Sequence, residues 1–159
     1  MIAPLGQRTF ADEVAIMESL FALRVDRLSF TAWAPWAQRG GLAGVDRPGV
    51  YLLARFRSEP PPKADPLDAS VLYIGETVRQ RLGKRWYDFA RSAFKKKDGH
   101  SGGWAYRKRV ATTPRALYVA ALPVELAEPH LGAYVRMVER SLLWAYVDRH
   151  GRLPWCNSK

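Results

Sequence analysis

Apolar residues recur at helical spacing in three segments of the chain, residues 10–28, 79–97 and 131–150. Steps of three and four residues place such positions on one face of a helix, so each segment is predicted to be helical. The apolar positions are Phe10, Val14, Met17, Phe21, Val25 and Leu28 in the first segment, Leu82, Trp86, Phe89 and Ala93 in the second, and Leu131, Val135, Val138, Leu142 and Ala145 in the third.

Three short apolar runs predict β-strands over residues 49–56, 71–75 and 116–122. The first two runs flank residues 59–66, whose four prolines exclude a helix or a strand because proline lacks a backbone donor. Two strands joined by one irregular loop most simply pair antiparallel. Residues 32–48, which are rich in glycine and proline, are predicted to form a loop or a broken helix. The order of elements predicts an α/β fold of the α+β kind, with a small, mainly antiparallel sheet covered by helices.

Composition narrows the class of protein. The 159 residues fit one domain, and the 48% of hydrophobic residues favour a packed core over a disordered chain. No apolar run approaches the roughly 20 residues of a membrane span, and no signal peptide is visible, so no membrane partner is expected. The single cysteine, Cys156, excludes an internal disulfide and a cysteine-based zinc site. We therefore expect a cytoplasmic protein.

The formal net charge of +10 is concentrated in one segment. Residues 79–109 hold eleven basic and two acidic side chains, a net of +9, whereas the other 128 residues carry a net of +1. Such a basic segment binds phosphate backbones through counterion release, and a solvated helix face is the plainer alternative. The residues expected to contact nucleic acid are Arg79, Arg81, Lys84, Arg91, Lys95, Lys96, Lys97, Arg107, Lys108 and Arg109. The aromatic residues among these cations suit stacking on bases, although some of the rings are expected to belong to the core. They are Trp86, Tyr87, Phe94, Trp104 and Tyr106.

An ordered set of polar residues accompanies the predicted elements. Gly49-Val50-Tyr51 opens the first strand, and Tyr73-Ile74-Gly75 ends the second. At 100° per residue, Arg85 and Glu139 each lie at the edge of the apolar stripe of their helix, where a side chain can be held by packing and still reach a cleft. Asn157 follows the last helix. This order of two tripeptides, arginine helix, glutamate helix and late asparagine resembles the GIY-YIG nuclease family over residues 49–157.

The resemblance implies a three-stranded antiparallel sheet flanked by helices in a nuclease domain over residues 49–159. Residues 1–48 would then be an N-terminal helical extension of the same domain. The implied activity is metal-dependent hydrolysis of phosphodiester bonds in DNA. One Mg²⁺ or Mn²⁺ per site would be bound by Glu139.

The resemblance also implies a role for each remaining residue. Tyr51 would take the proton from water, Tyr73 would position water or phosphate, Arg85 would contact the phosphate, and Asn157 would brace the site. A tyrosine with an ordinary pKa near 10 is a poor base at neutral pH. The metal and the guanidinium are therefore expected to favour the phenolate by lowering the pKa of Tyr51.

Three features depart from the family pattern. Tyr51 and Tyr73 are 22 residues apart, where about ten are common, and the proline-rich loop accounts for the excess. The sequence Lys84-Arg85-Trp86 favours Arg85 as the catalytic arginine, and Arg81 is the competing candidate. Residues 98–103 are predicted to end the helix and to start a flexible basic loop, and residues 99–104 are an insertion relative to the simplest members of the family. His100 lies in this insertion and is a further catalytic candidate, since some restriction-enzyme-like members add a histidine to the site.

Each candidate has a plainer alternative. Glu139 could form only an ion pair with Arg136 or Arg140 on its own helix, His100 could be an exposed loop residue, and Asn157 could be a tail residue. The alternative function is a catalytically silent nucleic-acid-binding module that uses residues 79–109. DNA is the expected partner, RNA is an open alternative, and a homodimer or a larger complex would be compatible with the sequence.

Overall fold

The fold is built around a four-stranded antiparallel sheet with the strand order β1-β4-β2-β3. The computed structural model describes residues 9, 11, 15, 25 and 27–158, so most of the helix predicted over residues 10–28 lies outside the described residues. The strands are β1 (Ala34–Pro35), β2 (Gly49–Arg55), β3 (Val71–Thr77) and β4 (Leu117–Pro123). The three predicted strands form, and β1 corrects the expectation of a three-stranded sheet. Two residues are too few to produce a strand pattern, and a proline is tolerated here because β1 is an edge strand.

The register of the sheet brings the two tripeptide motifs together. Strand β2 is central, and Tyr51 on it lies opposite Gly75 of β3 and Ala121 of β4. Leu53 lies opposite Tyr73 in the same pairing of β2 with β3. Because side chains alternate between the two faces of a sheet, Tyr51 and Tyr73 point to the same side.

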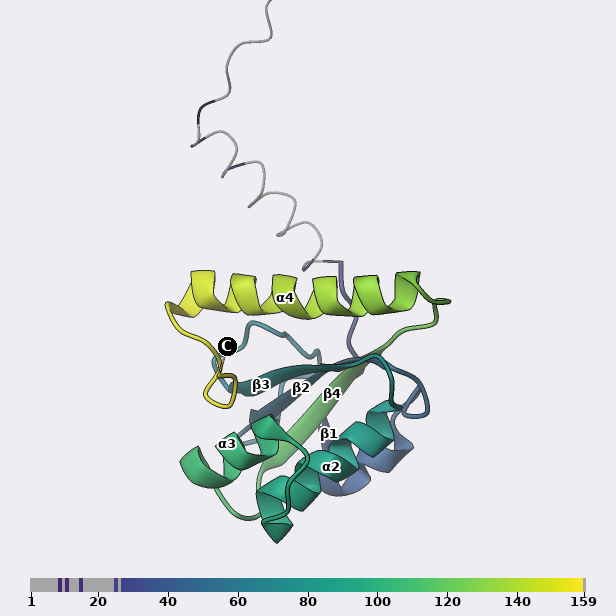
Figure 1. Ribbon diagram of the computed structural model, residues 1–159. Helices are drawn as coiled ribbons and strands as arrows, with labels where there is room; N and C mark the ends of the chain where they lie inside the picture. Colours follow the sequence, from purple (N-terminus) through teal and green to yellow (C-terminus); the bar gives the residue numbers. More distant parts are fainter. Residues whose placement is uncertain (1–8, 10, 12–14, 16–24, 26, 159) are drawn as a thin grey trace, which may run out of the picture.

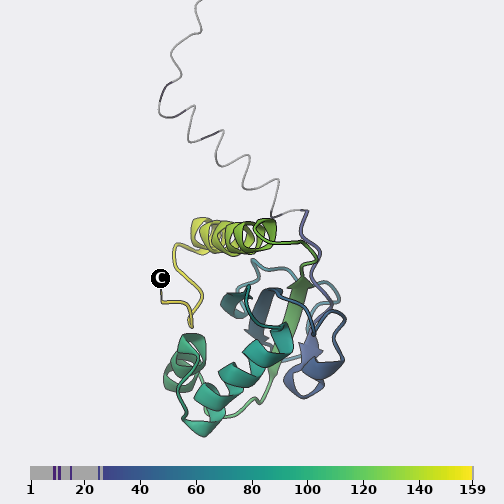
Figure 2. The same cartoon turned by 45° about the vertical axis from the view of Figure 1, so that its right-hand side comes forward.

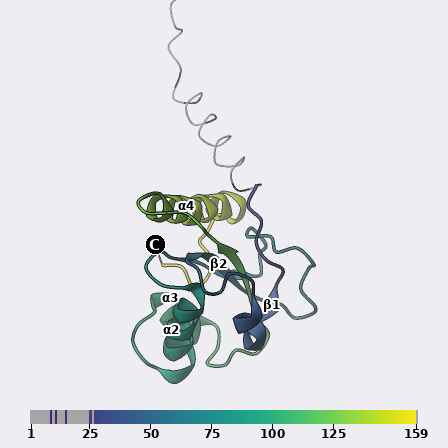
Figure 3. The same ribbon diagram turned by 90° about the vertical axis from the view of Figure 1, so that its right-hand side faces the viewer.

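Helices cover both faces of the sheet and make a three-layer molecule (Figure 1). One face packs on α4 (His130–His150) through a core that includes Leu52, Ile74 and Leu142. The other face, which carries Tyr51 and Tyr73, packs on α2 (Leu82–Lys95) and α3 (Ser101–Arg109). Figures 2 and 3 show the same order of layers from two other directions.

Helix α3 corrects the expectation of a flexible loop after residue 98. Its glycines serve close packing, because a Cβ at Gly103 would lie 2.7 Å from the carbonyl oxygen of Phe89 on α2. The first turn is capped by His100, whose side chain accepts a hydrogen bond from the Gly103 N–H. The hydroxyl of Ser92 accepts a hydrogen bond from the backbone N–H of His100 over 3.1 Å. The glycine-rich composition therefore marks a helix–helix contact here.

Residues 33–41 pack against the sheet and its helices and contribute to the hydrophobic core. Trp33 lies in the core beneath α4, and Trp36 lies in the core beneath α2. Trp36 also begins a 3₁₀ helix, η1 (Trp36–Gly41), where a loop or a broken helix was predicted.

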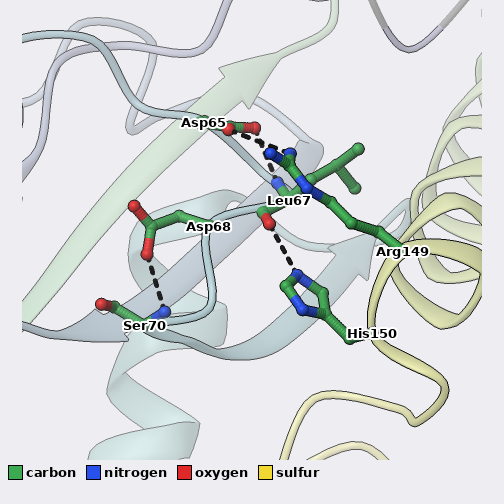
Figure 4. Close-up of polar contacts among 6 residues, drawn as sticks. All are labelled: Asp65, Leu67, Asp68, Ser70, Arg149 and His150. Atoms are coloured by element: carbon green, nitrogen blue, oxygen red, sulfur yellow. Dashed lines mark hydrogen bonds and ion pairs between the residues drawn. The ribbon is translucent and has the colours of Figure 1, made fainter.

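The long connection between β2 and β3 has no regular structure at residues 59–66, as its prolines predict. Side chains at the end of α4 hold this connection in place (Figure 4). The Arg149 guanidinium lies 3.5 Å from a carboxylate oxygen of Asp65, and His150 Nε2 lies 2.8 Å from the carbonyl oxygen of Leu67. Among the described residues, no helix is long and apolar enough to cross a membrane.

Candidate active site

Tyr51 and Tyr73 lie side by side on β2 and β3, beneath α2 and α3. Their ring centroids are 5.9 Å apart, and both side chains are buried. A Cβ at Gly75 would lie 2.4 Å from the Tyr73 ring and 2.7 Å from Cζ of Tyr51. Glycine is therefore required for steric reasons at this position of the second motif, because a side chain would fill the space in which the two phenol rings meet.

His100 reaches this pair from the start of α3. Its Nε2 lies 2.8 Å from the hydroxyl oxygen of Tyr51, and the side chain is only 2% exposed. The backbone N–H of Gly103 donates to Nδ1 over 3.1 Å, so a neutral His100 carries its proton on Nε2 and donates it to Tyr51. Burial, and to a lesser extent the charge of Arg85, lower the pKa of His100 from 6.5 to about 3. His100 is thus a buried, neutral hydrogen-bond donor and not an exposed loop residue.

Arg85, in the first turn of α2, is partly buried and faces the same group. Its guanidinium interacts electrostatically with Tyr51, Tyr73 and His100. Its Nε is buried and has no hydrogen-bond partner among the described residues. The competing candidate, Arg81, is an exposed residue that precedes α2. Arg85 is therefore the arginine that the structure brings to the tyrosines.

Two carboxylates approach Tyr73 from other elements. Glu139 comes from the middle of α4 and Glu76 from β3, and both interact electrostatically with Tyr73 and with each other. Burial raises the pKa of Glu139, Arg140 opposes this effect, and Glu76 adds to it. The ion pair anticipated on the helix does form, with Nε of Arg140 lying 3.4 Å from Oε2 of Glu139. Oε2 of Glu76 is buried and accepts no hydrogen bond among the described residues.

Asn157 holds the strand that carries the second motif. Its side-chain oxygen accepts a hydrogen bond from the Ile74 N–H over 3.0 Å, and its side-chain nitrogen donates to the Ile74 carbonyl over 2.8 Å. Ile74 lies between Tyr73 and Gly75, so this two-point contact fixes the backbone on which Tyr73 is mounted. Asn157 is buried and belongs to the fold as well as to the candidate site.

Burial controls the acidity of the two tyrosines. It raises the pKa of Tyr51 well above 10, Tyr73 adds to the increase, and Arg85 opposes it by its charge. Burial also raises the pKa of Tyr73, Arg85 lowers it, and Glu139 and Glu76 raise it. In the protein alone the pKa of Tyr51 is therefore raised, and its lowering in the presence of a bound metal stays a prediction. The guanidinium acts in the expected direction, but removal from water outweighs it.

The donor set near Tyr73 suits a hard divalent cation. Mg²⁺ usually takes one or two protein carboxylates and completes its shell with water and substrate phosphate. Glu139 and Glu76 offer that number, and the unpartnered oxygen of Glu76 is a free acceptor among the described residues. A positive ion would also offset the repulsion between the two carboxylates. In the part of the chain that the structure describes, no group of three or more His, Cys, Asp and Glu side chains could hold a metal ion.

The ten basic residues expected to bind nucleic acid all lie on or beside α2 and α3. Two of them are partly buried, Arg91 and Arg107, and Arg107 donates to the Ala93 carbonyl over 3.2 Å. The eight exposed ones are Arg79, Arg81, Lys84, Lys95, Lys96, Lys97, Lys108 and Arg109. The basic segment thus presents most of its charge to solvent on the layer that packs against the tyrosines.

The aromatic residues of this segment are mostly part of the core. Trp86 and Tyr106 are fully buried, Phe94 and Trp104 are partly buried, and Tyr87 alone of the five is exposed, at 51%. Trp86 and Tyr106 are therefore the rings that belong to the core, and neither can stack on a base. For Trp86 the signal was its place in the apolar stripe of its helix. Tyr106 lay in a segment predicted as a loop and had no such signal.

Sequence reasoning missed two residues beside the motifs. Glu76 directly follows Tyr73-Ile74-Gly75, and that adjacency was the available signal. Trp155 lies two residues before Asn157 and is 55% exposed. No pattern in the sequence distinguishes an exposed tryptophan in an irregular tail from a buried one.

The chain was compared with known protein families, proteins and structures. No protein-family model, no curated protein and no solved structure matches it.

Proposed function

We propose that the chain is a metal-dependent endonuclease of the GIY-YIG kind that hydrolyses phosphodiester bonds in DNA. The observation that supports this proposal is the meeting of five elements at one place: Tyr51 from β2, Tyr73 from β3, Arg85 from α2, His100 from α3 and Glu139 from α4. In this proposal β2, β3 and β4 with their helices form the three-stranded nuclease core, and β1 is an addition to it.

Phosphodiester hydrolysis needs a base for the attacking water, positive charge at the phosphate and help for the leaving oxygen. Arg85 is proposed to bind a non-bridging phosphate oxygen, because its buried Nε–H has no partner among the described residues and a guanidinium suits bidentate contact. The oxygen of water bonds to phosphorus as the bond to the leaving oxygen breaks. Tyr51 is proposed to take the proton that the water loses.

Tyr51 can act as a base only when its phenolate is stabilised. Its oxygen accepts a hydrogen bond from His100, and the guanidinium of Arg85 also favours the ionised form. Burial opposes both effects. Tyr73 lies beside Tyr51 and interacts electrostatically with Glu139 and Glu76. It is proposed to orient the water or the phosphate.

Glu139 would hold the divalent cation, with Glu76 as a second carboxylate. When bound, the cation supplies positive charge that stabilises the leaving oxygen and the ionised side chains of the site.

The test is cleavage of supercoiled plasmid DNA by purified protein with Mg²⁺. Wild type and Asp148→Asn should nick the plasmid, since Asp148 is an exposed carboxylate on the same helix as Glu139. Glu139→Gln, Tyr51→Phe and Arg85→Ala should each lose about 100-fold or more in rate. Equal cleavage by wild type and Glu139→Gln would overturn the proposal.

A parallel gel-shift measurement separates the enzyme from a silent binding module. Tight, salt-sensitive binding that is indifferent to EDTA, without any cutting, would favour the binding module. A labelled RNA of the same sequence, run beside the DNA, shows which nucleic acid is cut.

A further inference from the structure

Trp155 projects from a tail segment whose other residues are held against the molecule. It is 55% exposed, whereas Pro154, Cys156 and Asn157 are all buried. Single exposed apolar side chains are common and need no function. The surroundings of Trp155 distinguish it from such a residue.

The backbone at Trp155 is fixed by contacts on three consecutive residues. The Arg109 guanidinium donates to the Trp155 carbonyl over 2.7 Å, and the Cys156 N–H donates to the Leu72 carbonyl over 2.8 Å. Asn157 then makes its two hydrogen bonds to Ile74. In Figure 1 this tail runs down from α4 beside β3 toward α3. An exposed indole on so well-anchored a backbone loses little conformational entropy when it binds a ligand.

Trp155 lies beside β3 on the side of α3. The Cys156 N–H donates to the carbonyl of Leu72, which directly precedes Tyr73. Arg109, which holds the Trp155 carbonyl, ends α3, whereas His100 precedes its first residue, and a helix of nine residues spans about 13 Å. A group stacked on the indole would therefore belong to a part of the substrate about one helix length from His100.

Two arginines lie near Trp155, one at its ring and one at its backbone carbonyl. The Arg152 guanidinium carbon lies 5.4 Å from the centroid of the Trp155 ring, which is within cation–π range. Arg109, which holds the Trp155 carbonyl, belongs to the basic segment and follows the exposed Lys108. An aromatic face flanked by cations is the arrangement that single-stranded nucleic acid binds, by stacking a base and neutralising the phosphates on either side.

We propose that Trp155 stacks on an unpaired nucleobase of the bound substrate, so that the substrate is nucleic acid with unpaired bases near the cutting site. In a continuous duplex the faces of each base are covered by its neighbours, and an unpaired or flipped base alone offers a face to the indole. This inference rests on the proposed nuclease function and specifies its substrate.

The test compares two DNAs of the same sequence, a fully paired duplex and one with a short central bubble, in EDTA so that cutting does not interfere. The proteins are full-length wild type, Trp155→Ala, Trp155→Phe and Trp144→Ala. Trp144 is the matched control, because it is 58% exposed but lies on α4. Thermal unfolding of each variant shows that it is folded before its affinity is compared.

Trp155→Ala should bind the bubble about fivefold to a hundredfold more weakly and should bind the duplex within about twofold of wild type. Trp155→Phe should keep most of the bubble affinity, and Trp144→Ala should match wild type on both DNAs. A 2-aminopurine placed in the bubble should be quenched by wild type and not by Trp155→Ala.

Two results would overturn the inference. One is an unchanged affinity of Trp155→Ala for the bubble, which would be the outcome if the indole instead contacted a protein. The other is an equal loss on bubble and duplex. The affinity is measured without cutting. A failure to cleave plasmid would therefore contradict the nuclease proposal but would not change the measured effect of Trp155→Ala on binding to the bubble. A protein that cuts but shows no Trp155 effect would defeat this inference alone.

Discussion

The imidazole of His100 donates a hydrogen bond to the hydroxyl of Tyr51 over 2.8 Å, although 49 residues separate the two in the chain. The direction of this bond matters for chemistry. With Nδ1 occupied by the Gly103 N–H, a neutral His100 cannot accept the tyrosine proton and instead stabilises the phenolate.

Removing this donor should slow cleavage. His100→Ala is expected to cut plasmid about 100-fold to 1,000-fold more slowly, the range for deleting one donor from a buried anionic site. The rate should also reach its plateau at higher pH, because the pKa of Tyr51 rises when it loses a donor to its oxygen. Nicking rates measured across neutral and alkaline pH give both quantities. A rate and a pH profile identical to those of wild type would assign His100 to packing alone.

The low pKa of His100 also predicts how stability changes with acidity. The folded protein resists protonation of His100 down to about pH 3, whereas the unfolded chain accepts the proton at about pH 6.5. The free energy of unfolding should therefore fall as the pH drops below 6.5, by at most about 1.4 kcal/mol per pH unit from this residue. Urea unfolding of His100→Gln should show a shallower decline than wild type over the same range. An equal decline of the free energy of unfolding in wild type and His100→Gln would contradict the low pKa of His100.

Gly75 should not tolerate a side chain. An added Cβ would meet the rings of both tyrosines, at 2.4 Å from Tyr73 and 2.7 Å from Tyr51. Gly75→Ala is expected to lower the free energy of unfolding by about 1–3 kcal/mol and to separate the tyrosine pair. Gly40→Ala is the matched control, since nothing lies within 4 Å of a Cβ there. Urea unfolding of the two variants checks the prediction, and equal stability would contradict it.

The lysines at the end of α2 are expected to contact the phosphate backbone. Lys95, Lys96 and Lys97 are all exposed, and Lys96 has a left-handed backbone that asparagine tolerates. The variant Lys95→Gln, Lys96→Asn, Lys97→Gln should bind DNA more weakly and lower the salt slope by up to about 3, near 0.9 per lost phosphate contact. Arg57, Lys63 and Arg115, exposed cations outside the basic segment, provide a control triple. An unchanged salt slope would mean that the three lysines are solvent-exposed charges at the helix end that do not contact DNA.

Much of the fold could be predicted because its signals are local. The helices α2 and α4 have an apolar period, and the strands β2, β3 and β4 are short apolar runs, so a short window of sequence reveals each of them. Helix α3 could not be predicted in this way, since Gly103 packs against α2 and Gly102 against the ring of Tyr73, and both contacts depend on tertiary structure. The two-residue strand β1 has no pattern of its own and is defined by its pairing with β4.

Four residues of the candidate site were predicted because each stood in a motif or at the edge of an apolar stripe, whereas His100 and Asn157 were candidates through the family resemblance alone. Tyr51, Tyr73, Arg85 and Glu139 met one of these conditions. The sequence could not reveal the direction of the His100 hydrogen bond or the effect of burial on Tyr51, because both depend on which groups exclude water. Trp155 was missed for a related reason, since exposure in an irregular tail has no periodic signature.

The tail that carries Trp155 has a second effect on the sheet. Strand β3 is an edge strand, and its outer backbone groups would otherwise be open to another strand. Cys156 and Asn157 occupy the Leu72 carbonyl and both backbone groups of Ile74, with an asparagine side chain taking the place of a neighbouring strand. The contacts that hold Tyr73 in position thus also protect the sheet from edge-to-edge association. Local detachment of this tail would disorganise the candidate site and expose an aggregation-prone edge in the same event.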